Sequence, residues 1–380
     1  MKKILFLIED FRFGGVEVSL VNLLNNIDFK QKKYKVVVLM YGTHTDVLNK
    51  LKGNKNIRII NVNNKVVQCV GNFISKCMNQ YRAEKLKNKL VRYLVIRHIK
   101  NNNYDVVIRY HHAAIKTLFT RLKKKRNQKF VTWYHRSIPT DYYLNKEYLN
   151  NCDKVIVVAE GCKQNILKEC KFLKDKIFVI DNLVPYKEIL SKMGCSQKLF
   201  SKDNFNIVTC ARIDMEKGID TAIETCKILK SKIDGLKWYV IGNVSADRIE
   251  YGKYIEDMIK KYGLEEEFIL LGGKQNPYPY FAQCDLYVQP SKEEACPLTT
   301  TEAQICCAPI VATETVGAKH LIKNDETGII SKNNPRALAD AIYDMYINIE
   351  KRIRISDNVK KIDFEAYNNN ILDKFYSIVD

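Results

Sequence analysis

Several features that mark other protein classes are missing from this 380-residue sequence. No apolar run approaches the roughly 20 residues of a membrane-spanning helix, so the sequence predicts no such helix. The apolar stretch at residues 4–8 follows Lys2 and Lys3 but ends at Glu9 and Asp10. It is too short for the core of a signal peptide, and we interpret it as a buried first strand. No repeat of about 20–50 residues and no low-complexity linker occurs, which excludes repeat architectures.

Metal-ligand and disulfide patterns are also missing. The sequence has 12 Cys, but none form a CxxC pair, and Cys306 and Cys307 are adjacent. This arrangement indicates reduced thiols rather than a disulfide framework. We therefore expect a cytoplasmic protein.

The positive charge is unevenly distributed. Residues 1–182 contain 36 Lys and Arg against 14 Asp and Glu, a net charge of +22, whereas residues 183–380 contain 26 against 29, a net charge of −3. A strongly basic first half points to an anionic partner, either an acidic lipid surface, a lipid-linked diphosphate or a nucleic acid. A lysine-rich solvated surface would explain the high lysine count but not the asymmetry.

Alternating strands and helices occur in two successive series. Strands are expected at residues 4–8, 34–41, 57–62, 105–108, 130–134, 154–158 and 177–180, and then at 206–209, 237–241, 268–271, 286–288 and from 310. Such alternation is typical of parallel sheets with helices on both faces. We predict an α/β fold with two doubly wound parallel-sheet domains facing across a cleft, at residues 1–182 and 183–362. The final helix, residues 363–380, is expected to cross back to the first domain.

Two basic segments lie in the first half. Residues 73–100 are expected to form a long helix with one apolar side, and its basic side chains include Lys76, Lys85, Lys89 and Arg92. A second basic cluster, residues 121–126, is expected to close another helix. A basic amphipathic helix can lie on an anionic membrane, although a surface helix packed on the sheet has the same pattern.

The segment at residues 285–313 is expected to form a strand, a loop, a helix and a strand. Glu294 falls in the loop and Glu302 in the second turn of the helix, with Pro297 in the first turn and Cys296 as the N-cap. Because Cys is a poor capping residue, N–H groups at the helix start remain available for a phosphate. Two carboxylates flanking such amides suit the sugar and ribose of a nucleotide sugar; two surface glutamates beside an ordinary helix are the alternative.

Further candidate residues follow other strands. Gly14 and Gly15 lie at the first strand-to-helix turn, where a missing side chain lets the backbone approach a ligand. His135 follows the strand at 130–134, and Arg212 and Lys217 follow the strand at 206–209. Ligands of parallel sheets bind at these strand ends. A tight glycine turn and a structural histidine are the alternatives.

Several of these motifs appear in a fixed order along the chain: Gly14-Gly15, His135, Arg212 with Lys217-Gly218, and Glu294-x7-Glu302. Together they resemble the retaining glycosyltransferases of family 4, which have the GT-B fold of two Rossmann-like domains. Residues 271–313 are especially similar to the enzymes that build bacterial envelope and capsular polysaccharides. The resemblance covers nearly the whole chain, and its most specific part is the pair of glutamates with the upstream arginine and lysine.

The resemblance implies a metal-independent, retaining transfer of a hexose or N-acetylhexosamine from a nucleoside-diphosphate sugar, with UDP as the expected nucleotide. The implied acceptor is a lipid-linked glycan, so the enzyme would be peripheral at the inner face of the cell membrane and would need no cofactor. No nucleic acid is expected as a partner, because the aromatic residues show no RNP-like or helix-turn-helix spacing. A GDP-mannose-dependent mannosyltransferase and a non-catalytic sugar-nucleotide-binding protein remain as alternatives.

The resemblance also assigns the diphosphate site. Arg212 and Lys217 are expected to bind the donor diphosphate. The sequence contains no Asp-x-Asp motif for a metal ion, so fixed cations must neutralise the leaving phosphate. The resemblance also places backbone N–H groups at this diphosphate site, from Gly14, Gly15, Leu298 and Thr299. Pro297 lies in the same segment but has no N–H.

Four further residues receive roles from the resemblance. Glu302 is expected to accept hydrogen bonds from the ribose, and Glu294 to contact hydroxyl groups of the transferred sugar. The backbone around Lys274 is expected to line the base pocket. His135 is expected to lie beside the sugar and the acceptor and to orient the reacting groups.

Two positions depart from the family pattern. Ala295 stands where a glycine usually follows the first glutamate, and Gly242-Asn243 replaces the usual Gly-x-Gly. We expect the first change to reduce backbone freedom near the sugar and the second to alter the neighbouring part of the nucleotide site.

Overall fold

The computed structural model describes residues 1–63, 80–110, 120, 122–137, 146–245 and 248–380. The chain divides into two compact units, Met1–Leu183 with Asn369–Asp380 (unit 1) and Val184–Asn368 (unit 2). The first part of the expected basic helix, residues 73–79 with Lys76, lies outside the described residues, as does Arg121.

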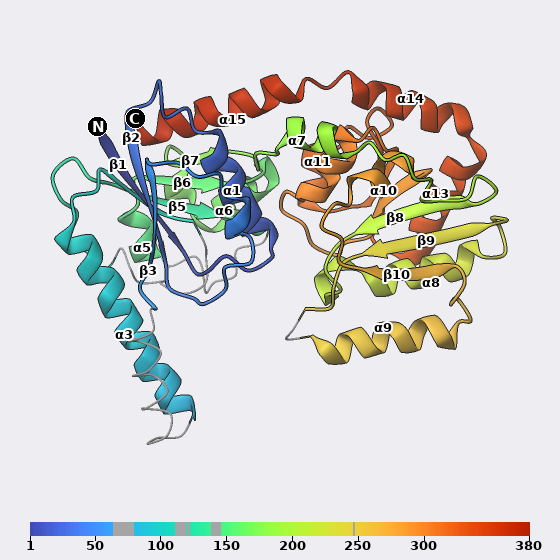
Figure 1. The fold of residues 1–380 in the computed structure, drawn as a ribbon, viewed down its shortest axis with the longest axis horizontal. Helices are drawn as coiled ribbons and strands as arrows, with labels where there is room; N and C mark the ends of the chain where they lie inside the picture. Colours follow the sequence, from blue (N-terminus) through green and yellow to red (C-terminus); the bar gives the residue numbers. More distant parts are fainter. Residues whose placement is uncertain (64–79, 111–119, 121, 138–145, 246–247) are drawn as a thin grey trace. The chain divides into compact units, whose positions relative to one another are not determined.

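Unit 1 is built on a parallel sheet with the strand order β3-β2-β1-β4-β5-β6-β7 (Figure 1). Its strands are β1 (Lys2–Ile8), β2 (Tyr34–Met40), β3 (Ile57–Asn61), β4 (Val106–Arg109), β5 (Lys129–Tyr134), β6 (Lys154–Val157) and β7 (Ile177–Val179). The chain forms β2 and β3 on one side of β1 and then β4 on the other, so the strand order reverses between β1 and β4. Residues 4–8 are fully buried, which confirms the expected first strand.

The helices and short 3₁₀ turns described between the strands of unit 1 are α1 (Gly15–Asn26), η1 (Leu48–Lys50), α3 (Gln80–Asn101), α5 (Lys146–Asn150), α6 (Glu160–Glu169) and η2 (Lys171–Leu173). The C-terminal part of the last helix of the chain, α15 (Phe364–Val379), also belongs to this unit.

The end of α15 packs on the sheet of unit 1. Phe375 is fully buried, and its ring centroid lies 6.2 Å from that of Phe6 on β1 and 6.3 Å from that of Trp133 on β5. The carboxylate of Asp380 accepts a hydrogen bond from the Tyr34 hydroxyl at 2.6 Å. An aromatic side chain and a polar contact thus attach the last helix to strands from the beginning and the middle of the unit.

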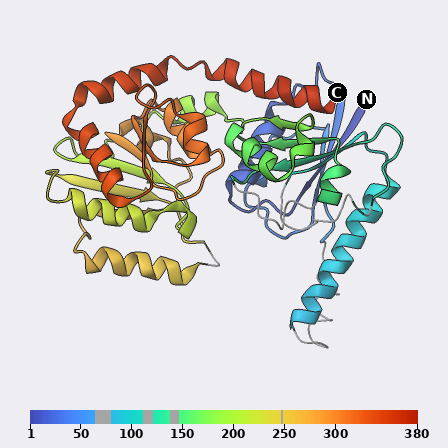
Figure 2. The same ribbon diagram turned by 180° about the vertical axis from the view of Figure 1, so that it is seen from behind.

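The long helix α3 extends away from the sheet of unit 1 (Figures 1 and 2). Val95 and Ile99 are buried on its inner side, whereas Tyr93 is 58% exposed. Lys85 and Lys89 are exposed on the outer part of the helix. The described part of the expected helix is therefore amphipathic with a basic outer side. None of the helices within the described ranges is long and apolar enough to span a membrane.

The described residues of the second basic cluster follow a helix and, contrary to expectation, do not form its last turn. Thr120 is helical, residues 122–125 form a loop, and Asn127 has a φ of 63°, which turns the chain before β5. Lys124 Nζ donates to the Asp153 carboxylate at 2.7 Å. Lys125 Nζ donates to the backbone oxygen atoms of Lys100 and Asn102, both at 3.0 Å. The Lys125 ammonium group thus caps carbonyl groups at the end of α3, where a positive charge is favourable.

Unit 2 contains a second parallel sheet with the strand order β10-β9-β8-β11-β12-β13. Its strands are β8 (Phe205–Cys210), β9 (Leu236–Ile241), β10 (Phe268–Gly272), β11 (Leu286–Gln289), β12 (Ile310–Thr313) and β13 (Ile329–Ser331). The connecting elements are α7 (Tyr186–Lys192), η3 (Met215–Lys217), α8 (Ile219–Leu229), α9 (Ile249–Lys261), α10 (Tyr278–Gln283), α11 (Leu298–Ile305), α12 (Val316–Leu321), α13 (Pro335–Ile347) and α14 (Ile349–Lys360). Two doubly wound parallel sheets confirm the predicted fold class.

A buried tryptophan ties together the central strands of unit 2. Trp238 on β9 is fully buried, and its Nε1–H donates to Thr209 Oγ1 on β8 at 3.0 Å. The same hydroxyl donates to the carbonyl oxygen of Val288 on β11 at 2.7 Å. The indole therefore buries its large apolar surface without leaving its N–H unsatisfied, and it fixes the strands whose ends carry the candidate site.

The packing of α15 can be tested by truncating one ring. Phe375→Ala should lower the free energy of unfolding by about 3–5 kcal/mol, because the substitution removes buried surface and leaves a cavity. Phe172→Ala is the matched control in the same unit, since Phe172 is 43% exposed and should change stability by no more than about 0.5 kcal/mol. Denaturant unfolding measures both variants. Equal effects would contradict the docking of α15 on this sheet.

Candidate active site in unit 2

The strand order of unit 2 reverses between β8 and β11, which are hydrogen-bonded neighbours. In an open parallel sheet, the loops that follow two such strands diverge and leave a crevice at their C-terminal ends. The loop after β8 carries Arg212 and Lys217, and the loop after β11 carries Glu294. Three of the residues expected in the site therefore lie on the two loops at the reversal point.

A glycine brings these two loops into contact. Gly218 follows Lys217 with a φ of 65°, and a Cβ atom there would lie 2.0 Å from the carbonyl oxygen of Pro290. The Lys292 N–H also donates to the carbonyl oxygen of Glu216 at 2.9 Å. Only a residue without a side chain can adopt this conformation and approach the neighbouring backbone so closely, so Gly218 places Lys217 beside the β11 loop.

Lys217 and Glu294 form a partly buried ion pair. Lys217 Nζ donates to Glu294 Oε1 at 2.7 Å, and the two side chains are 19% and 11% exposed. The same Oε1 accepts hydrogen bonds from Ser291 Oγ at 2.9 Å and from Gln289 Nε2 at 3.4 Å. Within the described part of the chain, all hydrogen bonds to this carboxylate are made to Oε1, so Oε2 keeps its acceptor capacity for a ligand.

A buried hydrogen-bond network continues behind Glu294. Gln289, 3% exposed at the end of β11, accepts a hydrogen bond from the Tyr287 hydroxyl at 2.9 Å and one from Thr299 Oγ1 at 3.2 Å. Its Nε2 donates to Ser291 Oγ at 2.6 Å. Sequence reasoning missed both Gln289 and Ser291. The pattern that could have pointed to them is a pair of polar side chains at the end of an otherwise apolar strand.

The helix α11 begins one residue later than expected. Pro297 is the N-cap rather than the first helical residue, because its ψ of 121° is extended. No side chain accepts a hydrogen bond from the first turn at this cap, so the N–H groups of Leu298 and Thr299 face no capping side chain. Cys296 is therefore not the N-cap, but the reason for proposing a phosphate site there, amides without a side-chain cap, agrees with this geometry.

Glu302 lies in the second turn of α11, as expected, among thiol and phenol groups. Burial, together with the negative charge of Glu302, raises the pKa of Cys306 to about 12. Burial followed by the Glu302 charge also raises the pKa values of Cys210 and Tyr278. These neighbours therefore stay protonated near neutral pH, and Glu302 and Glu294 lie on either side of the helix start in the sequence.

The position that departs from Gly-x-Gly has a structural explanation. Asn243 Oδ1 accepts a hydrogen bond from the Gly273 N–H at 2.7 Å, so the side chain joins the ends of β9 and β10. Lys274 is exposed in the loop directly after β10. Ala295 is not among the described non-glycine residues with a positive φ, so an alanine there carries none of the strain that a left-handed conformation would impose.

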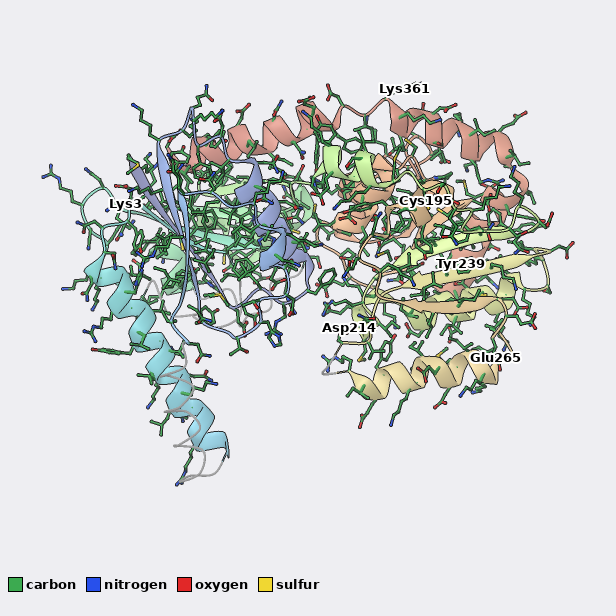
Figure 3. The ribbon with its side chains drawn as sticks, viewed as in Figure 1. Lys3, Cys195, Asp214, Tyr239, Glu265 and Lys361 are labelled. Carbon is green, nitrogen blue, oxygen red and sulfur yellow. The ribbon has the colours of Figure 1, made fainter. Side chains whose placement is uncertain are left out.

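Arg212 is more loosely positioned than Lys217. Its Nη1 lies 3.8 Å from Asp214 and donates to Ser245 Oγ at 3.4 Å, and its side chain is 49% exposed. Arg248 Nε also lies 3.8 Å from Asp214, which stands in the loop beyond β8 (Figure 3). Sequence reasoning missed this second guanidinium group, because the acidic residue that brings it near Arg212 is distant from it in the sequence.

Three expected site residues belong to unit 1. Gly14 is the extended N-cap of α1, and a Cβ atom there would lie 2.4 Å from Glu17 Oε2. Gly15 is exposed, and a Cβ atom there would meet no atom within 4 Å. His135 directly follows β5, and its ring lies 4.6 Å from Tyr110 and 5.8 Å from Trp133, centroid to centroid. All three lie at the C-terminal ends of β1 and β5, where the strand pattern predicted them.

Metal-ligating side chains do not gather in threes anywhere in the residues that the structure describes. The candidate site in unit 2 contains the charged side chains of Arg212, Lys217, Glu294 and Glu302. The uncapped N–H groups at the start of α11 lie in the same unit. Two cations, two carboxylates and free N–H groups can together bind a phosphorylated ligand with several hydroxyl groups.

Two family models match consecutive parts of this chain. The model described as Glycosyltransferase Family 4 matches residues 13–188, and the model described as Glycosyl transferases group 1 matches residues 196–362.

Similar proteins of known name include the capsular polysaccharide biosynthesis glycosyltransferase CapM of Staphylococcus aureus, 24% identical over 58% of this chain and 59% of its own length. A second is the N-acetylgalactosamine-N,N'-diacetylbacillosaminyl-diphospho-undecaprenol 4-alpha-N-acetylgalactosaminyltransferase of Campylobacter jejuni, 27% identical over 47% of this chain and 46% of its own length. The matches thus span less than two thirds of these relatives.

Among solved structures, HepE of Anabaena in complex with UDP covers 99% of this chain and 100% of its own, with 18% identity and a TM-score of 0.73. At this identity the likeness shows the fold alone. The two family models together match nearly the whole chain, and the protein therefore belongs to the glycosyltransferases with a family 4 domain followed by a group 1 domain, in the GT-B fold.

Proposed function

We propose that this glycosyltransferase moves a hexose or N-acetylhexosamine from a UDP-sugar to a lipid-linked glycan, with retention of configuration at the anomeric carbon. The observation that carries the proposal is the Lys217–Glu294 pair at the point where the strand order of unit 2 reverses. In this pair, the Lys217 ammonium group, proposed to bind phosphate, lies 2.7 Å from Glu294 Oε1. The other oxygen of this carboxylate, Oε2, is available to sugar hydroxyl groups. HepE, solved with UDP, and CapM, a capsular polysaccharide enzyme, support this choice of donor and pathway class.

The donor is bound by unit 2 in this proposal. Arg212 and Lys217 neutralise the diphosphate, and the N–H groups of Leu298 and Thr299 donate to it from the start of α11. Glu302 accepts hydrogen bonds from the ribose. The backbone around Lys274 lines the base pocket, while Glu294 Oε2 accepts from the hydroxyl groups of the sugar.

Unit 1 supplies the acceptor side of the reaction in this proposal. The Gly14 and Gly15 backbone approaches the diphosphate, and His135 orients the acceptor hydroxyl beside the sugar. The acceptor oxygen forms its bond to the anomeric carbon on the face from which the nucleoside diphosphate departs. A donor phosphate oxygen takes the acceptor proton, so the bond to the leaving phosphate breaks as the new glycosidic bond forms. The two fixed cations stabilise the charge that develops on the leaving group without a metal ion.

The nucleotide can be identified by stabilisation. At equal concentrations, UDP should raise the melting temperature further than GDP or dTDP. A ligand at a hundred times its dissociation constant adds about 2.7 kcal/mol of stability, so the nucleotide that binds most tightly stabilises most. Preferential stabilisation by GDP would instead favour a GDP-mannose-dependent mannosyltransferase. A donor that binds but is neither transferred nor hydrolysed would favour a non-catalytic binding protein.

The acceptor side is proposed to include an anionic membrane surface. The basic half of the chain is unit 1, whereas the donor site lies in unit 2. A nucleotide sugar therefore does not account for the position of the charge, but a lipid-linked acceptor in an anionic leaflet does. The exposed side of α3, with Lys85, Lys89 and Tyr93, supports this assignment because it combines cations with an amphipathic ring.

The diphosphate clamp can be tested by removing either cation. Arg212→Ala and Lys217→Met should each weaken UDP binding by about tenfold to a hundredfold, the loss expected for a charge-assisted hydrogen bond. Lys253→Met, at an exposed lysine of α9, is the matched control and should bind UDP normally. Isothermal titration calorimetry measures the affinities. Wild-type turnover should survive EDTA, and a requirement for added Mg²⁺ or Mn²⁺ would refute the metal-independent assignment.

The two glutamates should have separable effects. Glu302→Gln should weaken UDP binding, because its proposed partner is the ribose. Glu294→Gln should lower turnover by about tenfold or more while UDP binds as well as before or severalfold more tightly, since the substitution removes a negative charge that neutralises Lys217. Calorimetry with UDP and a transfer assay separate these outcomes. A similar loss of UDP affinity in both variants would contradict the assignment.

Membrane binding can be tested by charge reversal on α3. The double variant Lys85→Glu, Lys89→Glu should bind vesicles of anionic lipid at least about tenfold more weakly, since each basic residue near such a surface contributes roughly 1 kcal/mol. Lys30→Glu with Lys33→Glu is the matched control, at exposed lysines elsewhere in unit 1. Both variants should keep their activity on a short-chain acceptor analogue. Equal binding of the wild type to anionic and neutral vesicles in a flotation assay would rule out the membrane assignment.

A further inference from the structure

We propose that Gln289 is a positioning residue that sets the orientation of the Glu294 carboxylate and couples it to the start of α11. The inference rests on the proposed function of Glu294 as a sugar-binding carboxylate and adds a residue behind it. The observation is a continuous, buried chain of hydrogen bonds from Thr299 through Gln289 and Ser291 to Glu294.

The Glu294 carboxylate at the end of this chain determines which group donates in each of its hydrogen bonds. An ionised carboxylate can only accept, so the Ser291 hydroxyl must donate its single proton to Glu294 Oε1. The Ser291 oxygen can then only accept a hydrogen bond from Gln289 Nε2, at 2.6 Å. The carbonyl oxygen of the Gln289 amide consequently faces the hydroxyl groups of Tyr287 and Thr299, which donate to it.

An amide is the side chain that this direction requires. Position 289 must present a donor towards the buried Ser291 hydroxyl and an acceptor towards the half-buried Thr299 hydroxyl. A methionine of similar length provides neither group, and an ionised glutamate provides only the acceptor. Because buried polar groups without partners are costly, the chain acts as a unit and loses its effect when one link is removed.

The backbone around Gln289 is also held in place. Thr313 Oγ1 on β12 donates to the carbonyl oxygen of Gln289 at 3.1 Å and to that of Ser291 at 2.5 Å. The strand exit that carries both side chains is therefore fixed to its neighbour in the sheet. A rigid base of this kind lets a change in one hydrogen bond reach Glu294 rather than being absorbed by movement of the loop.

The groups around position 289 determine how a carboxylate would behave there. Glu294 lies nearest, with its Oε1 3.4 Å from Gln289 Nε2, and Lys217 pairs with the same oxygen on its other side. The Tyr287 hydroxyl contacts Gln289 from the same strand, and Cys210 on β8 and Glu302 on α11 lie near Tyr287. Burial raises the pKa of Tyr287 and of Cys210, so both stay protonated near neutral pH, whereas the charge of Glu302 adds to the negative potential at Tyr287.

These surroundings make Gln289→Glu a pH-dependent test. Burial and the adjacent Glu294 carboxylate should both raise the pKa of the introduced glutamic acid. Below that pKa the protonated acid presents an O–H to Ser291 and a carbonyl oxygen to Thr299, in the same directions as the amide. Above it the side chain becomes an acceptor only and repels Glu294. Activity should therefore be near normal at low pH and be lost as the pH rises.

The experiment compares the transfer rates of Gln289→Glu, Gln289→Met and the wild type between pH 5.5 and 8.5. The Glu variant should retain turnover within about threefold of the wild type at pH 5.5 and fall at least about tenfold below it at pH 8.5. The Met variant should be about tenfold slower than the wild type at every pH, because it never supplies a donor. UDP affinity is measured by calorimetry at each pH. Gln289→Met should bind UDP within about twofold of the wild type at every pH, which shows that unit 2 remains folded, and Gln289→Glu should do so at pH 5.5, where its side chain is protonated.

Three outcomes would overturn the inference. The first is a ratio of Gln289→Glu to wild-type turnover that does not change with pH, and the second is a Met variant as active as the wild type. The third is a parallel loss of turnover and UDP affinity in the Met variant, which would indicate a merely structural residue. If Gln289→Glu does not fold, Ser291→Ala takes its place, and it should lower turnover about tenfold with UDP affinity kept.

A readout without catalysis separates this inference from the proposed function. A wild type that transfers no sugar from any nucleotide would refute the proposed function and leave the network open to test by stability. The introduced acid has a higher pKa in the folded state than in the unfolded state, so the folded variant binds more protons between these two values. The melting temperature of Gln289→Glu should therefore fall relative to the wild type as the pH rises from about 5. A difference in melting temperature that is constant with pH would show that residue 289 does not face Glu294.

Discussion

The ion pair between Lys217 and Glu294 is the constraint on which the arrangement of unit 2 depends. The two residues are 77 positions apart, and their side chains meet at 2.7 Å in a partly buried place. A buried pair is favourable only when its geometry is good and further hydrogen bonds satisfy the remaining polar groups. Here β8 and β11 must be neighbours, Gly218 must lie against Pro290, and Ser291 must donate to the same carboxylate.

The same ion pair joins the residue proposed to bind the diphosphate, Lys217, to the residue proposed to bind the sugar, Glu294. The positive charge of Lys217 is balanced by Glu294, whereas Arg212 is 49% exposed and lies 3.8 Å from Asp214. In the proposed function, an incoming diphosphate would compete with Glu294 for Lys217 and with Asp214 for Arg212. Diphosphate binding and the orientation of Glu294 would then be linked through the Lys217 ammonium group.

The strand ends and the residues that follow them could be predicted from the sequence, because buried parallel strands are short apolar runs bounded by polar residues. The strand ends that precede Arg212, Lys217 and Glu294 were predicted in this way, and so was the helix that carries Glu302. Gln289 was not, because its role depends on the register of β11 against its neighbours and on a loop closed by Gly218. The helix start was displaced by one residue, since the extended ψ of Pro297 could not be inferred from its identity.

The net charge of the first half illustrates a different limit of sequence reasoning. A basic cluster at 121–126 suggested an outward-facing surface, but Lys124 pairs with Asp153 and Lys125 binds the carbonyl groups that end α3. Those cations contribute to the structure of unit 1 and only partly to its external field. Lys85 and Lys89 have no such partner in the described region. They lie in the first half of α3, a helix that extends away from the sheet (Figure 1). The cations of α3 are therefore the ones that the proposed membrane contact would use, because these side chains are not already engaged within the described fold.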